Sequence, residues 1–414
     1  MSIKHIIKRL RETKVLENYT YMTALNIFTA LISLIIYPYI IRVTGKYTYG
    51  IYVYAMTIAL YFQIFLDFGF ESPCAKAIVK NINNSAMCSE ILSAVFSAKT
   101  YFYLLSIAIF CSLYAISSFV RENLLICLIC FLQSYALSLF PQWYFQAIKD
   151  MKRVTYINLS CRLLTIPFIF LFVKNSQDIW IYALITTISY FVGTIIAYIF
   201  ILNNKLKIKL LSLRIVFPYL KEAFPFFISD LAGNLKEGLL KTIIKNVFGI
   251  AEVAVYDLAI KLISIVRIFT QNINKSLFPE FIDRSTKDKV RQILKYERII
   301  GLTITVLTCL VAYPAILLLG GSEMLDAFPL VLILSWTIYS YLIIRVYLDF
   351  VFVASGRYLF VTKNQLVALS SSVLLSLVGL FMWHNVATIA LALSISGFIE
   401  IIYCRYVCIR EKLL

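Results

Sequence analysis

Residues 18–70 read NYTYMTALNIFTALISLIIYPYIIRVTGKYTYGIYVYAMTIALYFQIFLDFGF and contain two apolar runs, 18–41 and 49–70, on either side of a short segment around Gly45. A membrane-spanning helix needs about 20 consecutive, mainly apolar residues, and both runs are that long. We therefore expect residues 18–70 to form two consecutive membrane spans joined by a short loop.

The rest of the chain repeats this pattern. Of the 414 residues, 61% are hydrophobic and 15% are charged, whereas soluble domains average about 45–50% apolar and about 25% charged residues. The composition excludes a soluble domain, a disordered chain and a small disulfide scaffold, and it predicts an all-α integral membrane protein with about twelve transmembrane helices. The expected spans are 18–41, 49–70, 100–119, 124–145, 155–173, 179–202, 217–245, 251–278, 299–319, 328–352, 364–382 and 387–407.

The distribution of positive charge predicts the orientation of the chain. It carries 39 Lys and Arg against 22 Asp and Glu. In a soluble protein this excess would indicate nucleic-acid binding, but in a membrane protein basic residues gather in cytoplasmic loops. One side of the expected spans holds 27 of them, including Lys76, Lys80 and Lys99 in the connection 71–99, and the other side holds five. We expect both termini in the cytoplasm, contacts with membrane lipids and no nucleic-acid partner.

The two halves of the chain resemble each other around their second spans. GKYTYGIYVYAMTIALYFQIF (45–65) aligns with GIAEVAVYDLAIKLISIVRIF (249–269), and the identical pairs are Gly45 with Gly249, Tyr52 with Tyr256, Ala55 with Ala259 and Phe65 with Phe269. Because six expected spans separate the copies, we expect two six-helix bundles related by pseudo-two-fold symmetry, V-shaped with a central cavity. The expected parts are a cytoplasmic amphipathic segment (1–17), an N-terminal bundle (18–202), a basic cytoplasmic linker (203–216), a C-terminal bundle (217–407) and a cytoplasmic tail (408–414).

Charged residues inside the expected spans are the main functional signal. A charge at the bilayer centre costs about 2.5–3.5 kcal/mol on insertion scales, so such residues usually face a cavity or a partner. Two spans carry polar residues at helical spacing, and charges also occur in other spans, among them Arg162 in 155–173. The residues are Asp230, Asn234, Glu237, Lys241 and Lys245 in 217–245, Asp257, Lys261, Ser264, Arg267, Gln271 and Asn274 in 251–278, Arg345 in 328–352 and Asp67 in 49–70.

This pattern predicts a hydrated cavity with a positive bias, which would favour an anionic cargo. The candidate binding residues are Lys241, Lys261, Arg267 and Arg345. Two roles remain open for the acidic residues, which either neutralise neighbouring Lys and Arg or take up coupling protons. These acids are Asp67, Asp230, Glu237 and Asp257. Acid–base pairs four residues apart on one helix could also neutralise each other at a helix interface that has no cavity.

Motifs of soluble catalysis do not occur in the sequence. It has no GxxxxGK[ST], HExxH or GxSxG motif and only two His residues. We therefore expect no built-in ATP engine, no catalytic residues, no cofactor and no metal site.

The first two spans resemble the O-antigen and polysaccharide-unit flippases of the multidrug/oligosaccharidyl-lipid/polysaccharide exporter superfamily. The matching residues are Pro38-Tyr39, Arg42, Gly45, Tyr49-Gly50, Tyr52 and Asp67-Phe68-Gly69, together with PFFISDLAGNL (225–235), Gly249, Tyr256, Ala259 and Lys261. The resemblance implies that Arg42 and Asp67 are motif members and that Lys261 occupies a position that is usually basic. Arg42 thereby joins the candidate residues of the cationic cavity.

The same resemblance implies a transporter rather than an enzyme, placed in the bacterial inner membrane. Its cargo would be an undecaprenyl-pyrophosphate-linked oligosaccharide that moves from the cytoplasmic to the outer leaflet, with antiport of a cation, H⁺, as the coupling. The repeat-unit polymerase and the chain-length regulator are the implied protein partners. The alternatives are a multidrug or metabolite cation antiporter of the same fold, and a membrane glycosyltransferase or polymerase. The short extracytoplasmic loops disfavour the enzyme.

Overall fold

The structure is a computed structural model that describes the backbone of residues 14–282 and 287–414 and the side chains of residues 20–268, 270 and 287–414. Every regular element in these residues is a helix. Most of the expected amphipathic segment 1–17 lies outside the described residues, as do the side chains of Gln271 and Asn274.

The described residues form two compact units. Unit 1 comprises the described part of Met1–Ile36 and Ala55–Asp230, and unit 2 comprises Tyr37–Tyr54 and Leu231–Leu414. The expected bundles 18–202 and 217–407 divide the chain at other points than these units, because each unit groups residues by the contacts they make. The two bundles stay predictions.

Unit 1 is built from long helices with short connections. Within it, α9 packs against both α6 and α8, and α3 packs against α7. Its helices are α2 (Lys14–Asp67, shared with unit 2), α3 (Glu71–Lys80), α4 (Ser85–Ile116), α5 (Ser118–Glu122), α6 (Leu124–Leu139), α7 (Gln142–Ala147), α8 (Met151–Phe172), α9 (Ile179–Asn203) and the start of α10 (Leu213–Phe248).

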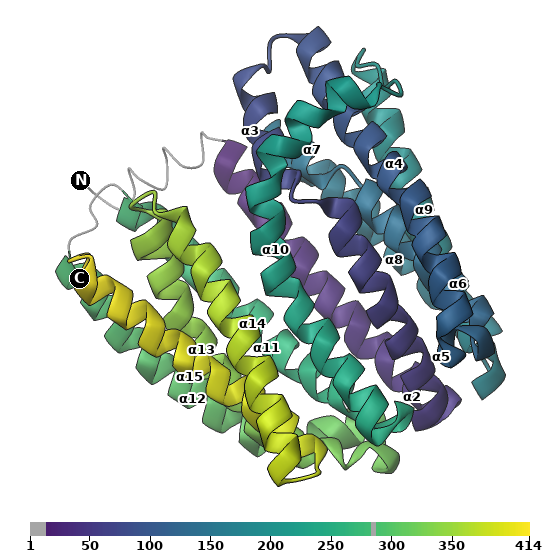
Figure 1. Cartoon of the computed structure of the whole chain (residues 1–414), viewed down its shortest axis with the longest axis vertical. Helices are drawn as coiled ribbons and strands as arrows, with labels where there is room; N and C mark the ends of the chain where they lie inside the picture. Colours follow the sequence, from purple (N-terminus) through teal and green to yellow (C-terminus); the bar gives the residue numbers. More distant parts are fainter. Residues whose placement is uncertain (1–13, 283–286) are drawn as a thin grey trace. The chain divides into compact units, whose positions relative to one another are not determined.

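Unit 2 is organised around α13, which packs against α11, α12 and α15, while α14 packs against α15 (Figure 1). The apolar side chains of Leu334, Ile338 and Leu342 on α13 are buried. In addition to the end of α10, unit 2 contains α11 (Ile250–Ile282), α12 (Lys287–Gly320), α13 (Ala327–Arg345), the π-helix η3 (Val346–Val353), α14 (Tyr358–Met382) and α15 (Val386–Arg410).

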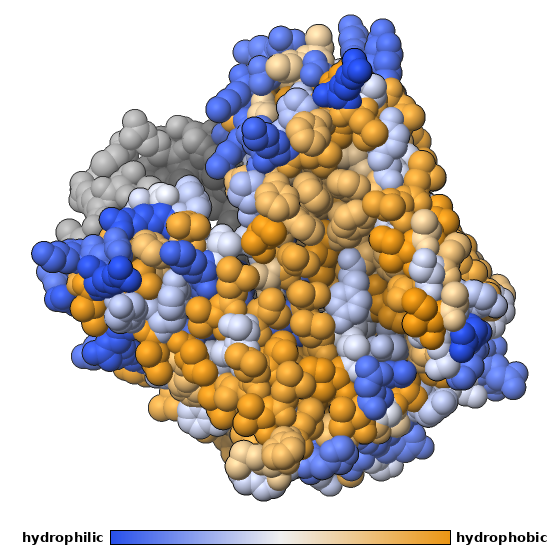
Figure 2. All heavy atoms as spheres, viewed as in Figure 1, coloured by the Kyte–Doolittle hydropathy of each residue, from blue (hydrophilic) through white to orange (hydrophobic). Residues whose placement is uncertain are grey.

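Large apolar side chains cover the outer faces of the helices in both units. Phe381 on α14 is 94% exposed and Leu164 on α8 is 63% exposed. Figure 2 shows apolar residues over most of the visible helix surface, with hydrophilic residues gathered near helix ends. A soluble monomer rarely exposes apolar surface on this scale, so these faces are lipid-facing and the chain is an all-helical membrane protein.

Nine stretches of the described residues are long and apolar enough to cross a membrane. One of them, Thr20–Lys80, contains two of the expected spans, because α2 breaks at Gly45. Helices α10 and α11, of 36 and 33 residues, are not among the nine. They are long enough to cross, but they carry the charged stripes and are therefore less apolar.

The glycines paired by the internal repeat have the same unusual backbone conformation. Gly45 breaks α2 with φ +75°, and Gly249 separates α10 from α11 with φ +97°. For a residue with a Cβ atom the left-handed region costs about 1–2 kcal/mol. Both halves therefore use glycine to turn the chain between two long helices.

A third glycine, Gly50 in α2, allows close packing inside unit 2. A Cβ atom at this position would overlap the backbone carbonyl of Ile250 at the start of α11. The part of α2 that follows the break at Gly45 can approach the start of α11 this closely only because Gly50 has no side chain.

We expect Gly50→Ala to destabilise the protein by about 1–3 kcal/mol, since backbone must move to admit the methyl group. The melting temperature of the purified variant measures this. Gly193→Ala is the matched control, because its methyl group would meet Ile157 and Cys161 at 3.5 and 3.6 Å, which is ordinary contact. Equal melting temperatures for the two variants would contradict the close approach.

Candidate functional site: a charged pocket in the second unit

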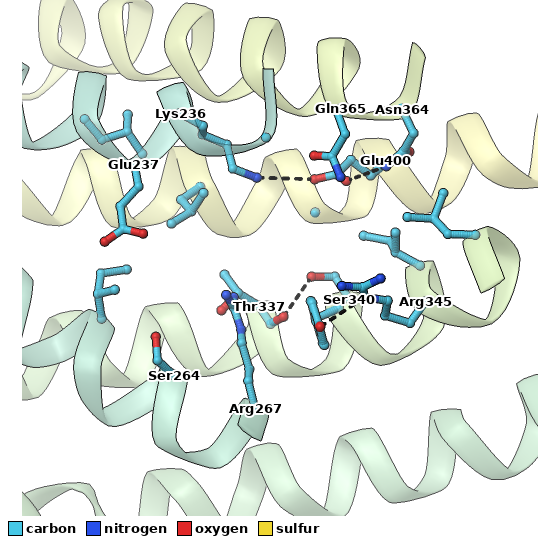
Figure 3. Close-up of a pocket in the computed structure, with 18 of the residues that line it drawn as sticks. Lys236, Glu237, Ser264, Arg267, Thr337, Ser340, Arg345, Asn364, Gln365 and Glu400 are labelled. Atoms are coloured by element: carbon cyan, nitrogen blue, oxygen red, sulfur yellow. Dashed lines mark hydrogen bonds and ion pairs between the residues drawn. The ribbon is translucent and has the colours of Figure 1, made fainter. Parts of the chain in front are cut away.

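Unit 2 contains a polar pocket of about 240 Å³ between α10, α11, α13, α14 and α15. Figure 3 shows two walls, with Lys236, Gln365 and Glu400 on one and Arg267 and Arg345 on the other. Both walls lie within helices of length sufficient to cross a bilayer, so the pocket is a polar space inside an apolar bundle.

The first wall, which holds Arg267 and Arg345, places two guanidinium groups near a tyrosine ring. The guanidinium carbons of Arg267 and Arg345 lie 5.3 and 5.4 Å from the ring centre of Tyr341. Arg345 Nε donates a hydrogen bond of 3.0 Å to the Tyr341 hydroxyl, and Arg345 pairs with Asp349 at 3.5 Å. Arg267 makes no ion pair with any described residue, and its buried Nε has no hydrogen-bond partner there. Arg267 is therefore a cation with unused hydrogen-bonding capacity.

The second wall, which holds Lys236, Asn364, Gln365 and Glu400, combines carboxylate, amide and ammonium groups. Asn364 Nδ2 donates to Glu400 Oε2 at 2.9 Å, and Asn364 Oδ1 accepts from Cys404 Sγ at 3.2 Å. Lys236 Nζ lies 3.8 Å from Glu400 Oε1. That separation is long for a hydrogen bond, so both groups keep capacity for a ligand.

An ion network centred on the buried residues Lys241 and Asp257 adjoins the pocket through Glu237, whose side chain is 49% exposed. Lys241 Nζ lies 2.9 Å from Glu237 Oε1 and 2.9 Å from Asp257 Oδ1. Lys261 Nζ lies 2.7 Å from Asp257 Oδ2, which also accepts a 2.9 Å hydrogen bond from the Tyr49 hydroxyl. The two ammonium and two carboxylate groups balance in charge, which lowers the cost of burying Lys241 and Asp257.

The structure brings together most of the residues that the sequence singled out. Arg267, Arg345 and Glu237 line the pocket, and Lys241, Asp257 and Lys261 form the adjoining network. Their role in binding or coupling stays a prediction.

Arg42 is also in unit 2 but does not line this pocket. Its guanidinium donates to the carbonyl oxygens of Leu317 and Leu318, at 3.2 and 2.7 Å. These carbonyls belong to the last turn of α12, where a helix carries partial negative charge. The contact describes a helix cap, and a substrate-binding role for Arg42 stays a prediction.

The other two candidate acids, Asp67 and Asp230, lie in unit 1. Asp67 pairs with Lys99 at 3.1 Å, and Lys99 also donates to the carbonyl oxygen of Ser138 at 2.5 Å. The assignment of Lys99 to a basic loop is wrong, because α4 begins at Ser85 and Lys99 is buried well inside this helix. Asp230 is exposed.

Sequence reasoning missed the second wall of the pocket, formed by Lys236, Asn364, Gln365 and Glu400. Glu400 carried a usable signal, because it is a carboxylate inside the expected span 387–407. Lys236 lies next to Glu237 in sequence but outside the helical stripe that runs from Asp230 to Lys245. The described residues contain no group of three or more His, Cys, Asp or Glu that could hold a metal ion.

We expect Asp257→Ala to cost about 3–5 kcal/mol of stability, because the buried Lys241 keeps only the half-exposed Glu237 as its carboxylate partner among the described residues and Lys261 loses Asp257. Thermal unfolding of the purified variant tests this. Asp326→Ala is the control, since Asp326 also pairs with a lysine, Lys46 at 2.9 Å, but its side chain is 68% exposed. Exposed pairs contribute about 0–1 kcal/mol, so similar losses in both variants would argue against the network.

Comparison with known proteins is consistent with this architecture. The model of the family described as "Polysaccharide biosynthesis protein" matches residues 15–285, more than half of the chain. A predicted O-antigen transporter of Escherichia coli (strain K12) is 25% identical over 312 residues, which cover 74% of this chain and 73% of that protein. A predicted O-antigen transporter of Shigella dysenteriae is 24% identical over 204 residues, covering 49% and 50%.

Solved structures agree in fold. The lipid II flippase MurJ in an inward closed conformation superposes with a TM-score of 0.69 at 15% identity, covering 95% of this chain and 87% of that chain. An inward-facing multidrug resistance MATE family transporter of the MOP superfamily gives a TM-score of 0.60 at 14% identity, covering 92% and 99%. The fold is that of transporters and not of an enzyme, and the resemblance expected from residues 18–70 and 225–261 is confirmed. The chain belongs to the polysaccharide biosynthesis protein family, on the fold of the MATE and MurJ transporters.

Proposed function

We propose that this protein is a flippase that moves an undecaprenyl-pyrophosphate-linked oligosaccharide from the cytoplasmic to the outer leaflet of the bacterial inner membrane. The observation that carries the proposal is the pocket in unit 2, where the Arg267 guanidinium has no ion-pair partner among the described residues and Arg345 lies beside it. A pyrophosphate supplies the missing anion, because guanidinium groups bind phosphate oxygens through paired, charge-assisted hydrogen bonds.

The names of relatives support the same cargo class. The Escherichia coli relative is predicted to transport O-antigen, and MurJ is described as a flippase of lipid II. One name describes the transport of O-antigen and the other the flipping of a lipid. The repeat-unit polymerase, which would act on the delivered unit, and the chain-length regulator are the partners that this function implies.

The proposed topology has twelve spans in two six-helix bundles, V-shaped around a central cavity, with both termini in the cytoplasm. The nine apolar stretches support it, since Thr20–Lys80 holds two spans and α10 and α11 supply two more of sufficient length. Alternating access between the bundles would expose the cargo site to one side of the membrane at a time.

We assign proton coupling to Asp230. Asp67, Glu237 and Asp257 each hold a basic partner, which supports charge balancing. Asp230 makes no ion pair with another described residue, so its carboxylate is the one of the four with no cation to compete with a proton.

A multidrug or metabolite cation antiporter is the alternative on the same fold. An organic cation would be repelled by the free guanidinium of Arg267, and the pocket's carboxylates are each held by a basic or amide group. The charge of the pocket therefore favours the anionic cargo.

We expect Arg267→Ala and Arg345→Ala to reduce export of surface polysaccharide by about ten- to a hundredfold, because a hydrogen bond to a charged group contributes about 1.5–3 kcal/mol. Surface polymer is measured in a gene-deletion strain that carries each variant, with membrane abundance measured in parallel. Arg410→Ala, an exposed arginine in the last turn of α15, is the control. Unchanged polymer in both pocket variants, or no build-up of lipid-linked units on the cytoplasmic leaflet of the deletion strain, would refute the proposal.

For coupling, we expect Asp230→Asn to abolish the acceleration of flipping by an imposed proton gradient, because an amide cannot take up the proton. Flipping of undecaprenyl-pyrophosphate-linked saccharide in proteoliposomes measures this, with and without the gradient. Asp326→Asn serves as the control, and an intact gradient response in Asp230→Asn would remove Asp230 from the coupling role.

A further inference from the structure

The amide of Gln365 is an unused recognition group in the wall of the pocket. Gln365 lines the pocket from α14, and within the part of the chain that the structure describes its side chain has no hydrogen-bond partner. A glutamine amide offers two donor hydrogens and one acceptor oxygen. An amide that is half-buried in a polar pocket and has no hydrogen-bond partner in the described part of the chain is available to a ligand.

The groups around Gln365 are held in defined orientations. Glu400 is buried, and its Oε2 is fixed by the 2.9 Å hydrogen bond from Asn364, whose own oxygen is bound to Cys404. Figure 3 shows Gln365 and Glu400 close together on this wall, with Lys236 on the adjacent helix. Donors and acceptors thus alternate along one surface.

Neighbouring hydroxyl groups of a sugar ring match such a surface. Each hydroxyl donates one hydrogen bond and accepts others, so a row of amide, carboxylate and ammonium groups can bind two of them at once. Ser264, on the opposite wall, has no hydrogen-bond partner among the described residues and adds another free hydroxyl to the pocket.

The dimensions of the pocket limit how much of a ligand can enter it. Its volume of about 240 Å³ is below the 300–1,000 Å³ typical of pockets for drug-sized ligands. Gly233 keeps the space in front of Gln365 open, because a Cβ atom there would lie 3.5 Å from the Gln365 amide oxygen. One sugar ring would fit, whereas a whole oligosaccharide would not.

We infer that Gln365, with Glu400 and Asn364, forms a subsite that recognises the hydroxyl groups of one sugar of the cargo. This inference rests on the proposed function and adds to it a division of labour. The wall with Arg267 and Arg345 binds the anionic group, and the wall with Gln365 selects for the saccharide.

The test compares two probes on the purified full-length protein in lipid nanodiscs. One probe is undecaprenyl pyrophosphate, and the other is the same lipid bearing the repeat unit of the host strain. We expect Gln365→Ala to weaken binding of the saccharide-bearing lipid about tenfold, which corresponds to about 1.4 kcal/mol, and to leave binding of the bare lipid unchanged. Gly233→Ala, which narrows the space before Gln365, should act in the same direction, whereas Arg267→Ala should weaken both probes.

Leu366→Ala is the matched control, because Leu366 is the next residue on α14, is 44% exposed and does not line the pocket. The subsite is overturned if Gln365→Ala affects both probes equally or neither of them, or if the wild-type protein binds both probes equally. If the wild-type protein binds neither probe, the proposed function itself fails. The two failures are therefore distinguishable.

Discussion

The buried carboxylate of Asp257 is the interaction on which unit 2 depends. Charges in a low-dielectric interior are tolerated only when paired and hydrogen-bonded, and Asp257 meets Lys241 from α10, Lys261 from α11 and Tyr49 from α2. This requirement joins Tyr37–Tyr54, from the first half of the sequence, to helices of the second half. Lys46 and Arg42 strengthen the same attachment through Asp326 and the end of α12.

Neutralisation inside this network determines which charges remain available to a ligand. The ammonium groups of Lys241 and Lys261 are already paired with carboxylates. Arg267 has no such partner among the described residues, although it lies in the same polar region. The cationic character of the pocket therefore comes from a few guanidinium groups rather than from every lysine in the spans. Under the proposed function, a ligand group must therefore reach Arg267 to gain an unshared cation.

The polar site makes the membrane helices that build it less apolar. Helices α10 and α11 carry the network and part of the pocket. Their charged residues keep them out of the nine long apolar stretches. Helices such as α12 and α14 present large apolar residues outward, among them Leu310 and Phe381. The bundle thus directs charged residues of α10 and α11 toward the pocket and the network, and large apolar residues of α12 and α14 outward.

Sequence alone determined the helical membrane class, most of the spans, the correspondence of Gly45 with Gly249, and the stripes on α10 and α11, because apolar run length and helical periodicity are local properties. It could not decide which charges meet. Lys99 reads as a loop residue but is a buried partner of Asp67, and Arg42 caps α12. Gln365 and Glu400 join a pocket whose other wall is built by residues of other helices. Such pairings depend on side chains brought together by folding, so only the tertiary structure decided them.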